Sequence, residues 1–147
     1  MRLIVLAGLV SVEKTELAVM LAQYFVRRGQ TVTLIDNVSR TPMPPVEAVQ
    51  QVRIEDDPAP VLLSTLENLT SDVVIFAASE TVPPDVLFLL LDDVQQQLPA
   101  LAVQTLALID TRTCDCFPQF RVSLESYADG VINLPVEWAS VLEEIAG

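Results

Sequence analysis

The sequence predicts one three-layer α/β domain, in which helices cover both faces of a mostly parallel β-sheet. Residues 2–7 form a short apolar run, residues 12–28 have the pattern of a helix, and residues 31–35 are rich in β-branched side chains. A strand, a helix and a strand that ends at Asp36 indicate a right-handed βαβ unit with parallel strands. The 147 residues match the size of one ordinary domain, so a single unit over residues 1–147 is expected.

The first helix is the most regular of the predicted elements. Arg27 and Arg28 suit the negative end of its dipole, and Gly29 suits the position after the last turn. One apolar stripe runs along it at the spacing i, i+3, i+4 and i+7, formed by Leu17, Met20, Leu21 and Tyr24.

The rest of the chain continues the alternation of strands and helices, with one irregular region. Residues 37–60 contain five prolines and an acidic run, and they are predicted as a loop that could include a short helix over residues 45–51. The later elements are predicted as helices at 61–69, 84–98 and 120–127, strands at 72–77, 105–109 and 130–134, and a last helix that opens with Pro135 and carries Trp138, Val141, Leu142 and Ile145 on one face.

The composition narrows the classes of function. An apolar fraction of 51% and a mean hydropathy of +0.45 favour a compact core. A net charge of −12 repels phosphate backbones, so nucleic-acid binding is not expected. An acidic surface usually means only solubility, and a protein partner with a basic surface is the more specific interpretation. No apolar run reaches the roughly 20 residues of a membrane span, and no signal-peptide pattern is found, so a cytoplasmic protein is expected.

The only lysine of the chain, Lys14, lies in the segment Gly-Leu-Val-Ser-Val-Glu-Lys-Thr of residues 8–15. This segment differs at one residue from the phosphate-binding pattern G-x-x-x-x-G-K-[ST], because Glu13 replaces the second glycine. In such a loop the backbone N–H groups surround a phosphate, the lysine binds the β- and γ-phosphates, and the hydroxyl group ligates Mg²⁺. Gly8, Lys14 and Thr15 fulfil these requirements.

Glu13 does not fulfil them. Its carboxylate would lie beside the bound anion, and two unit charges about 4 Å apart repel each other by on the order of 4 kcal/mol at an effective dielectric near 20. Two other interpretations remain open. Ser11 could cap an ordinary helix that has Glu13 in its first turn, or the Glu13 carboxylate could itself occupy the anion site.

With these residues, the chain resembles the MinD/ParA class of P-loop NTPases, which includes the nickel-insertion ATPases of carbon monoxide dehydrogenase. The resemblance covers the first 36 residues well: the strand at 3–7, Gly8, the Lys14-Thr15 pair, and the strand that ends at Asp36. It implies a P-loop NTPase-like, Rossmann-like topology, binding of Mg-ATP or Mg-GTP, dimerisation that depends on nucleotide, and hydrolysis coupled to a partner. A homodimer is therefore one expectation.

The loop departs from the family at several positions. Leu9 stands where the family has an early lysine that acts across the dimer, and Val10 and Ser11 replace two glycines. With Glu13, three glycines of the family's loop are missing. These departures put nucleotide binding in doubt.

The acidic residues depart from the family as well. Asp36 matches the first acid after the second strand, but Val38 replaces the second acid of that pattern. The Mg²⁺-linked aspartate has two candidate strands: the strand at 72–77 ends in Ala77, whereas Asp110 follows the strand at 105–109. Asp110 is therefore the favoured metal-linked acid, although both Asp36 and Asp110 could also be ordinary turn residues.

Cys114 and Cys116 are the only cysteines. A disulfide across a single intervening residue would be strained, and a zinc site needs four ligands in a chain without histidine. Two copies of the pair could supply four thiolates at a dimer axis, as the resemblance to the nickel-insertion ATPases implies. Two ordinary thiols in a loop are the alternative.

Three functions follow from these observations. The leading hypothesis is a degenerate P-loop NTPase-like domain, a pseudoenzyme that has lost most or all NTP hydrolysis and acts through protein–protein contact. The second is a nucleotide-binding switch, and the third is a metal-handling accessory protein that uses Cys114 and Cys116. The candidate nucleotide-binding residues are Gly8, Glu13, Lys14, Thr15, Asp36 and Asp110.

Overall fold

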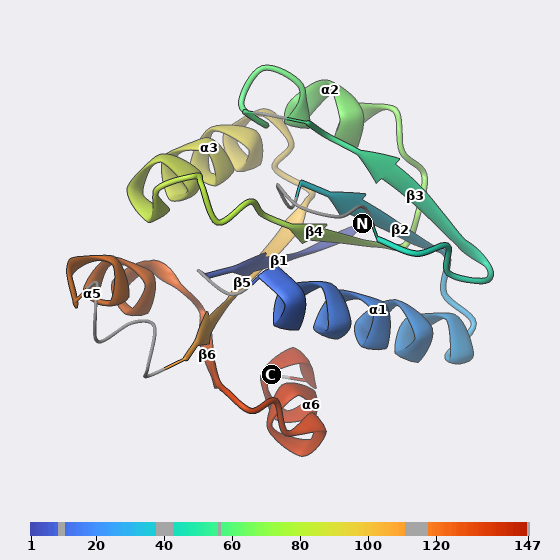
Figure 1. Cartoon of the computed structure of the whole chain (residues 1–147). Helices are drawn as coiled ribbons and strands as arrows, with labels where there is room; N and C mark the ends of the chain where they lie inside the picture. The colour runs from blue at the N-terminus through green and yellow to red at the C-terminus, as the bar shows by residue number, and fades with distance from the viewer. Residues whose placement is uncertain (9–10, 38–42, 56, 111–117, 147) are drawn as a thin grey trace.

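A six-stranded parallel sheet forms the middle layer of the domain (Figure 1). The computed structural model describes residues 1–8, 11–37, 43–55, 57–110 and 118–146. The strands follow the order β3-β2-β4-β1-β5-β6, and every neighbouring pair is parallel. Their bounds are β1 Arg2–Ala7, β2 Val32–Asp36, β3 Val49–Arg53, β4 Val73–Ala77, β5 Ala102–Ile109 and β6 Gly130–Asn133.

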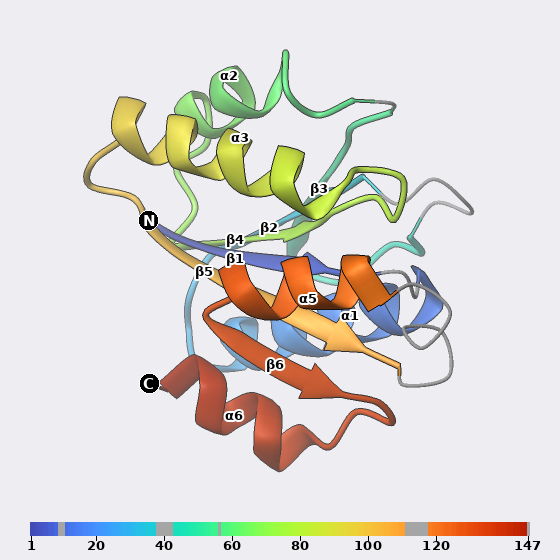
Figure 2. The same cartoon turned by 90° about the vertical axis from the view of Figure 1, so that its left-hand side faces the viewer.

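Helices cover both faces of this sheet (Figures 1 and 2). Helices α1 (Ser11–Arg27) and α6 (Trp138–Ala146) lie on one face, and α2 (Leu62–Glu67), α3 (Pro84–Gln97) and α5 (Pro118–Tyr127) lie on the other. This arrangement confirms the predicted three-layer α/β class. None of the helices in the described ranges has the length and apolar character that crossing a bilayer requires.

The central strands are buried on both sides, which explains why residues 2–7 read as a continuous apolar run. Leu3 and Val5 point to the core that α2, α3 and α5 cover, whereas Ile4 and Leu6 point to the core under α1 and α6. Alternate side chains thus supply two separate cores, and both layers of helices are held by the same strand.

The structure corrects two predictions. The short helix over residues 45–51 is wrong: β3 begins at Val49 and pairs with β2 at the edge of the sheet. The alternation of apolar and polar residues along β3 is weak, because this edge strand contacts only one neighbouring strand and its side chains are at most partly buried. The last helix begins at Trp138, so Pro135 lies before the helix and not at its first position.

Candidate phosphate-binding site at the carboxyl ends of the strands

The sheet order determines which residues surround the loop after β1. Strand β1 lies between β4 and β5, so the ends of these three strands meet at one edge of the sheet. Gly8 follows β1 with a φ of +146°, and a Cβ atom placed there would lie 2.6 Å from the Leu108 carbonyl oxygen. A side chain is excluded by the backbone angle and by the contact with β5. Packing alone therefore requires a glycine at this position, whether or not an anion binds.

Lys14 lies in the first turns of α1 and is completely buried. Its Nζ atom donates one hydrogen bond to the Gly8 carbonyl and one to the Ala78 carbonyl, each 2.7 Å long. These carbonyls follow β1 and β4, two neighbouring strands. Burial lowers the pKa of Lys14 from 10.5 to about 8, and the charge of Glu80 acts in the opposite direction. The amine is therefore mostly protonated at neutral pH, and it is held by the protein itself.

Glu80, in the turn after β4, is a residue that sequence reasoning missed. It is the carboxylate whose charge acts on Lys14, and its Oε2 atom is buried. Glu13 lies one residue before Lys14 in the first turn of α1 and is only partly buried. Thr15, the next candidate ligand, is partly exposed. The position of Glu80 just after a predicted buried strand was the one signal that could have drawn attention to it.

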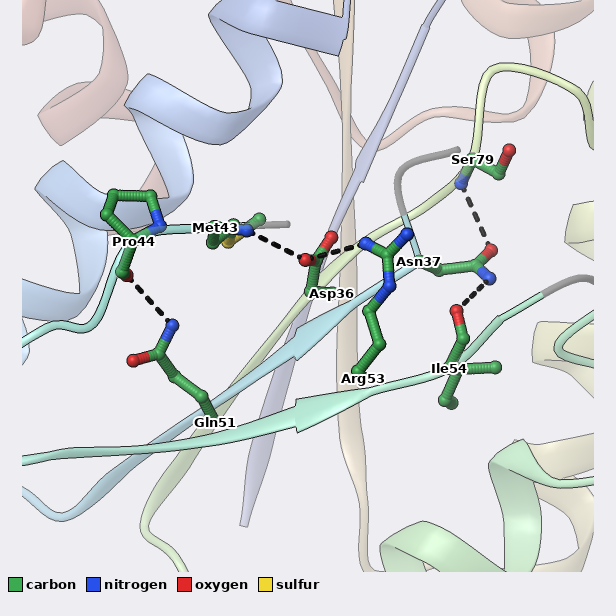
Figure 3. A network of polar contacts seen from close by, with 8 residues as sticks. All are labelled: Asp36, Asn37, Met43, Pro44, Gln51, Arg53, Ile54 and Ser79. Carbon is green, nitrogen blue, oxygen red and sulfur yellow. Dashed lines mark hydrogen bonds and ion pairs between the residues drawn. The ribbon is translucent and has the colours of Figure 1, made fainter. Parts of the chain in front are cut away.

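Asp36, at the end of β2, belongs to a second polar cluster (Figure 3). Its Oδ2 atom lies 2.7 Å from the Arg53 guanidinium of β3 and accepts a hydrogen bond of 3.1 Å from the backbone N–H of Met43. The Asp36 side chain is nearly inaccessible to solvent, whereas that of Arg53 is about a third exposed, at 29%. A cation supplied by the chain thus already contacts this carboxylate, which is one of the candidate nucleotide-binding residues of the sequence analysis.

Asn37 connects the ends of three strands in the same cluster (Figure 3). Its side chain donates to the Ile54 carbonyl at 2.9 Å and accepts from the Ser79 N–H at 3.1 Å. Its backbone N–H donates to the Ala77 carbonyl at 3.0 Å. Because Asn37 is buried, these bonds fix the edge of the sheet beside the turn that carries Glu80.

The structure separates the two candidate acids. Asp36 ends β2 and Asp110 follows β5, and the strands β4 and β1 lie between them. Three strand spacings amount to roughly 14 Å along the edge of the sheet. Ala77, directly beside Asp36 in the register of β2 and β4, has no acidic group to offer. The sequence-predicted acids are thus not brought together.

The remaining candidate residues are the two cysteines that the sequence offers as metal ligands. Cys114 and Cys116 lie outside the described residues, so the proposed thiolate site stays a prediction. Among the residues that the structure does describe, no group of three or more Cys, Asp or Glu side chains is placed to hold a metal ion.

The strand order and the helix after β1 give this chain the α/β fold of P-loop GTPases such as FtsY and YjiA, in agreement with the fold that the resemblance implied. The receptor FtsY from Elizabethkingia anophelis superimposes with a TM-score of 0.64 and 20% identity over 90% of this chain and 49% of its own. The signal recognition particle 54 kDa protein from Aeropyrum pernix, solved in complex with GDP, superimposes with a TM-score of 0.59 and 19% identity. The match covers 98% of this chain and 38% of that protein. The Zn(II)-bound GTPase YjiA from E. coli superimposes with a TM-score of 0.60 and 16% identity, over 99% of this chain and 52% of its own.

These similarities concern the fold. The chain spans about half, or less, of the length of these solved structures. Comparisons with known protein families and with curated protein sequences give no match.

Proposed function

We propose that this chain is a degenerate P-loop NTPase-like domain, with NTP hydrolysis lost or very weak, that acts mainly through contact with another protein. The state of Lys14 is the observation that carries the proposal. Its charge is compensated inside the fold by two carbonyls at 2.7 Å and by Glu80, without any phosphate. Two of its three ammonium N–H groups are thus already used, so a phosphate would be bound through the third N–H alone or in competition with these carbonyls.

Opening either of the two bonds of Lys14 has a cost in free energy. A hydrogen bond to a charged group contributes about 1.5–3 kcal/mol, and Lys14 makes two of them. The repulsion between a phosphate and Glu13 adds to that cost. Together these terms favour a lysine that stabilises the loop over one that binds a ligand.

The acids support the same proposal. The carboxylate of Asp36 contacts Arg53, and the strand next to it ends in Ala77. Catalytic Mg²⁺ is usually bound through one or two carboxylates together with the phosphates of the substrate. Here the Asp36 carboxylate is already engaged by Arg53, and the last residue of the neighbouring strand β4 is Ala77, which has no carboxylate.

A nucleotide-binding switch is the second candidate. It is favoured by the fold and by the fact that two of the similar structures contain GDP. In this case Lys14, Thr15, Asp36 and Asp110 would hold Mg-ATP or Mg-GTP.

Calorimetric titration with ATP and GTP in Mg²⁺ separates the two candidates. We expect no binding to the wild-type chain and gain of binding in Glu13→Gly, since this change removes the adjacent negative charge and restores the glycine of the motif. Lys14→Ala in the Glu13→Gly background serves as the control and should abolish that gain. ATP or GTP hydrolysis by the wild type that Lys14→Ala abolishes would overturn the proposal.

A further inference from the structure

Exposed apolar side chains gather on α3 and α5, which lie side by side on one face of the sheet (Figure 2). Leu89 on α3 is 69% exposed, which is high for a leucine, and Val86 on the same helix is also exposed. Val122 and Tyr127 are exposed on α5. Single exposed apolar residues are common, but an apolar group shared by two packed helices indicates a contact surface.

The outward stripe of α3 has a definite composition. At about 100° per residue, Val86 and Leu89 share a sector of about 120° with three carboxylates and one amide. The opposite side of the helix packs into the core through Leu87, Leu91 and Val94. Helix α3 contains no lysine or arginine, and the polar members of the outward stripe are Asp85, Asp92, Asp93 and Gln96.

Helix α5 extends this surface. The ring of Tyr127 packs on that of Phe88 with 5.1 Å between centroids, so the exposed tyrosine borders the stripe of α3. The one basic residue of α5, Arg121, pairs with Glu125 at 2.9 Å within the helix. The surface formed by Asp85, Val86, Leu89, Asp92, Asp93 and Tyr127, hereafter the α3–α5 surface, therefore combines exposed apolar side chains with carboxylates.

We propose that the α3–α5 surface binds a basic amphipathic segment of another protein. This inference rests on the proposed function, because it names the surface and the partner chemistry through which the domain acts. Apolar side chains of the partner would cover Leu89 and Tyr127, and its lysines or arginines would lie opposite Asp85, Asp92 and Asp93. A second copy of this chain is disfavoured as the occupant, because a two-fold contact would bring the carboxylates of two α3 helices together.

Binding of a synthetic helical Lys/Leu peptide to the full chain, followed by ¹⁵N NMR, tests the proposal. We expect the peptide to shift amide resonances of α3 and α5 and to leave those of α1 unchanged. A Glu/Leu peptide with the same apolar pattern should not bind, and rising salt should weaken the Lys/Leu complex. Shifts spread over all acidic parts of the chain would overturn the proposal, because they would indicate attraction by net charge alone.

A matched pair of double variants sharpens the test. Leu89→Gln with Asp92→Asn should weaken peptide binding by roughly tenfold or more, because it removes one apolar contact and one charge. Met20→Gln with Glu16→Gln makes the same change in charge on α1 and should leave binding unaltered. Equal weakening by both pairs would contradict the α3–α5 surface, and a dimer in sedimentation that Leu89→Gln dissociates would assign the surface to a second copy instead.

The two proposals fail separately. Absence of face-specific peptide binding, together with absence of nucleotide binding, would overturn the α3–α5 surface and leave the loss of nucleotide chemistry intact. Hydrolysis that depends on Lys14 would overturn the proposed function even if the peptide bound α3.

Discussion

Lys14 and Asp36 are two buried charges at the same edge of the sheet, and the protein compensates them in different ways. Lys14 is held by two main-chain carbonyls, with the charge of Glu80 as a further influence. Asp36 is held by the guanidinium of Arg53 and the backbone N–H of Met43. The direct contacts of the cation are thus main-chain dipoles, whereas the anion directly contacts a full opposite charge.

The difference determines how each centre should respond to change. Because carbonyl dipoles do not fully replace water, burial still lowers the pKa of Lys14 to about 8. Its contribution to stability should therefore depend on pH. The centre at Asp36 is a charge pair, so loss of one partner leaves the other buried without its counter-charge. In both centres the partners that compensate the charge come from the protein itself, and no bound nucleotide is needed.

The largest effect is expected from Lys14→Met in alkaline solution. The pKa of Lys14 falls from 10.5 to about 8 on folding, so the unfolded chain binds more protons between these pH values. The contribution of Lys14 to the free energy of unfolding of the wild type should thus rise with pH across that window and reach its full value above pH 10.5. At about 1.4 kcal/mol per pKa unit, the rise amounts to about 3 kcal/mol.

The measurement is the free energy of unfolding in urea at pH 7 to 11 for wild type and Lys14→Met. Titration of tyrosines, cysteines and the N-terminus cancels in the difference, and no other lysine contributes. A difference that does not change with pH would mean that Lys14 is not buried as the structure shows.

A smaller effect, about 2 kcal/mol, is expected for Arg53→Met. Breaking a buried ion pair costs about 3–5 kcal/mol, and the partial exposure of Arg53 reduces that figure. The double variant Arg53→Met with Asp36→Asn should recover much of the loss, because it leaves no uncompensated charge. Strict additivity of the two changes in urea unfolding would show that the pair contributes no coupling energy.

The fold was largely predictable, because the signals that determine it are local. Residues 2–7, the helix ending at Arg27 and the strand ending at Asp36 each carry their own apolar period or β-branched run. The exception is β3, whose residues are mostly polar and gain their strand geometry from pairing with β2. A strand of this kind depends on its neighbour more than on its own sequence.

The candidate site was predictable only in part. The sequence identified Lys14 and the loop, but it pointed to Glu13 as the nearby negative charge. The groups that contact or influence Lys14 include Ala78 and Glu80, which lie more than 60 positions away along the chain. Only the parallel pairing of β1 with β4 brings them to the lysine, and no local pattern encodes that proximity.

The smallest expected effect is a shift in the pKa of Lys14, and it shows whether Glu80 or Glu13 supplies the counter-charge. Glu80 raises the pKa of Lys14 against the larger effect of burial, so Glu80→Gln should lower that pKa further. The rise of stability with pH, measured as the difference from Lys14→Met in the same background, should then begin at lower pH. Glu13→Gln removes the same charge from the residue next to Lys14 and should move the onset less, because the charge that acts on the Lys14 amine is that of Glu80. A larger shift in Glu13→Gln than in Glu80→Gln would reassign the counter-charge to the loop, and would make Glu13 the group that takes the place of a phosphate.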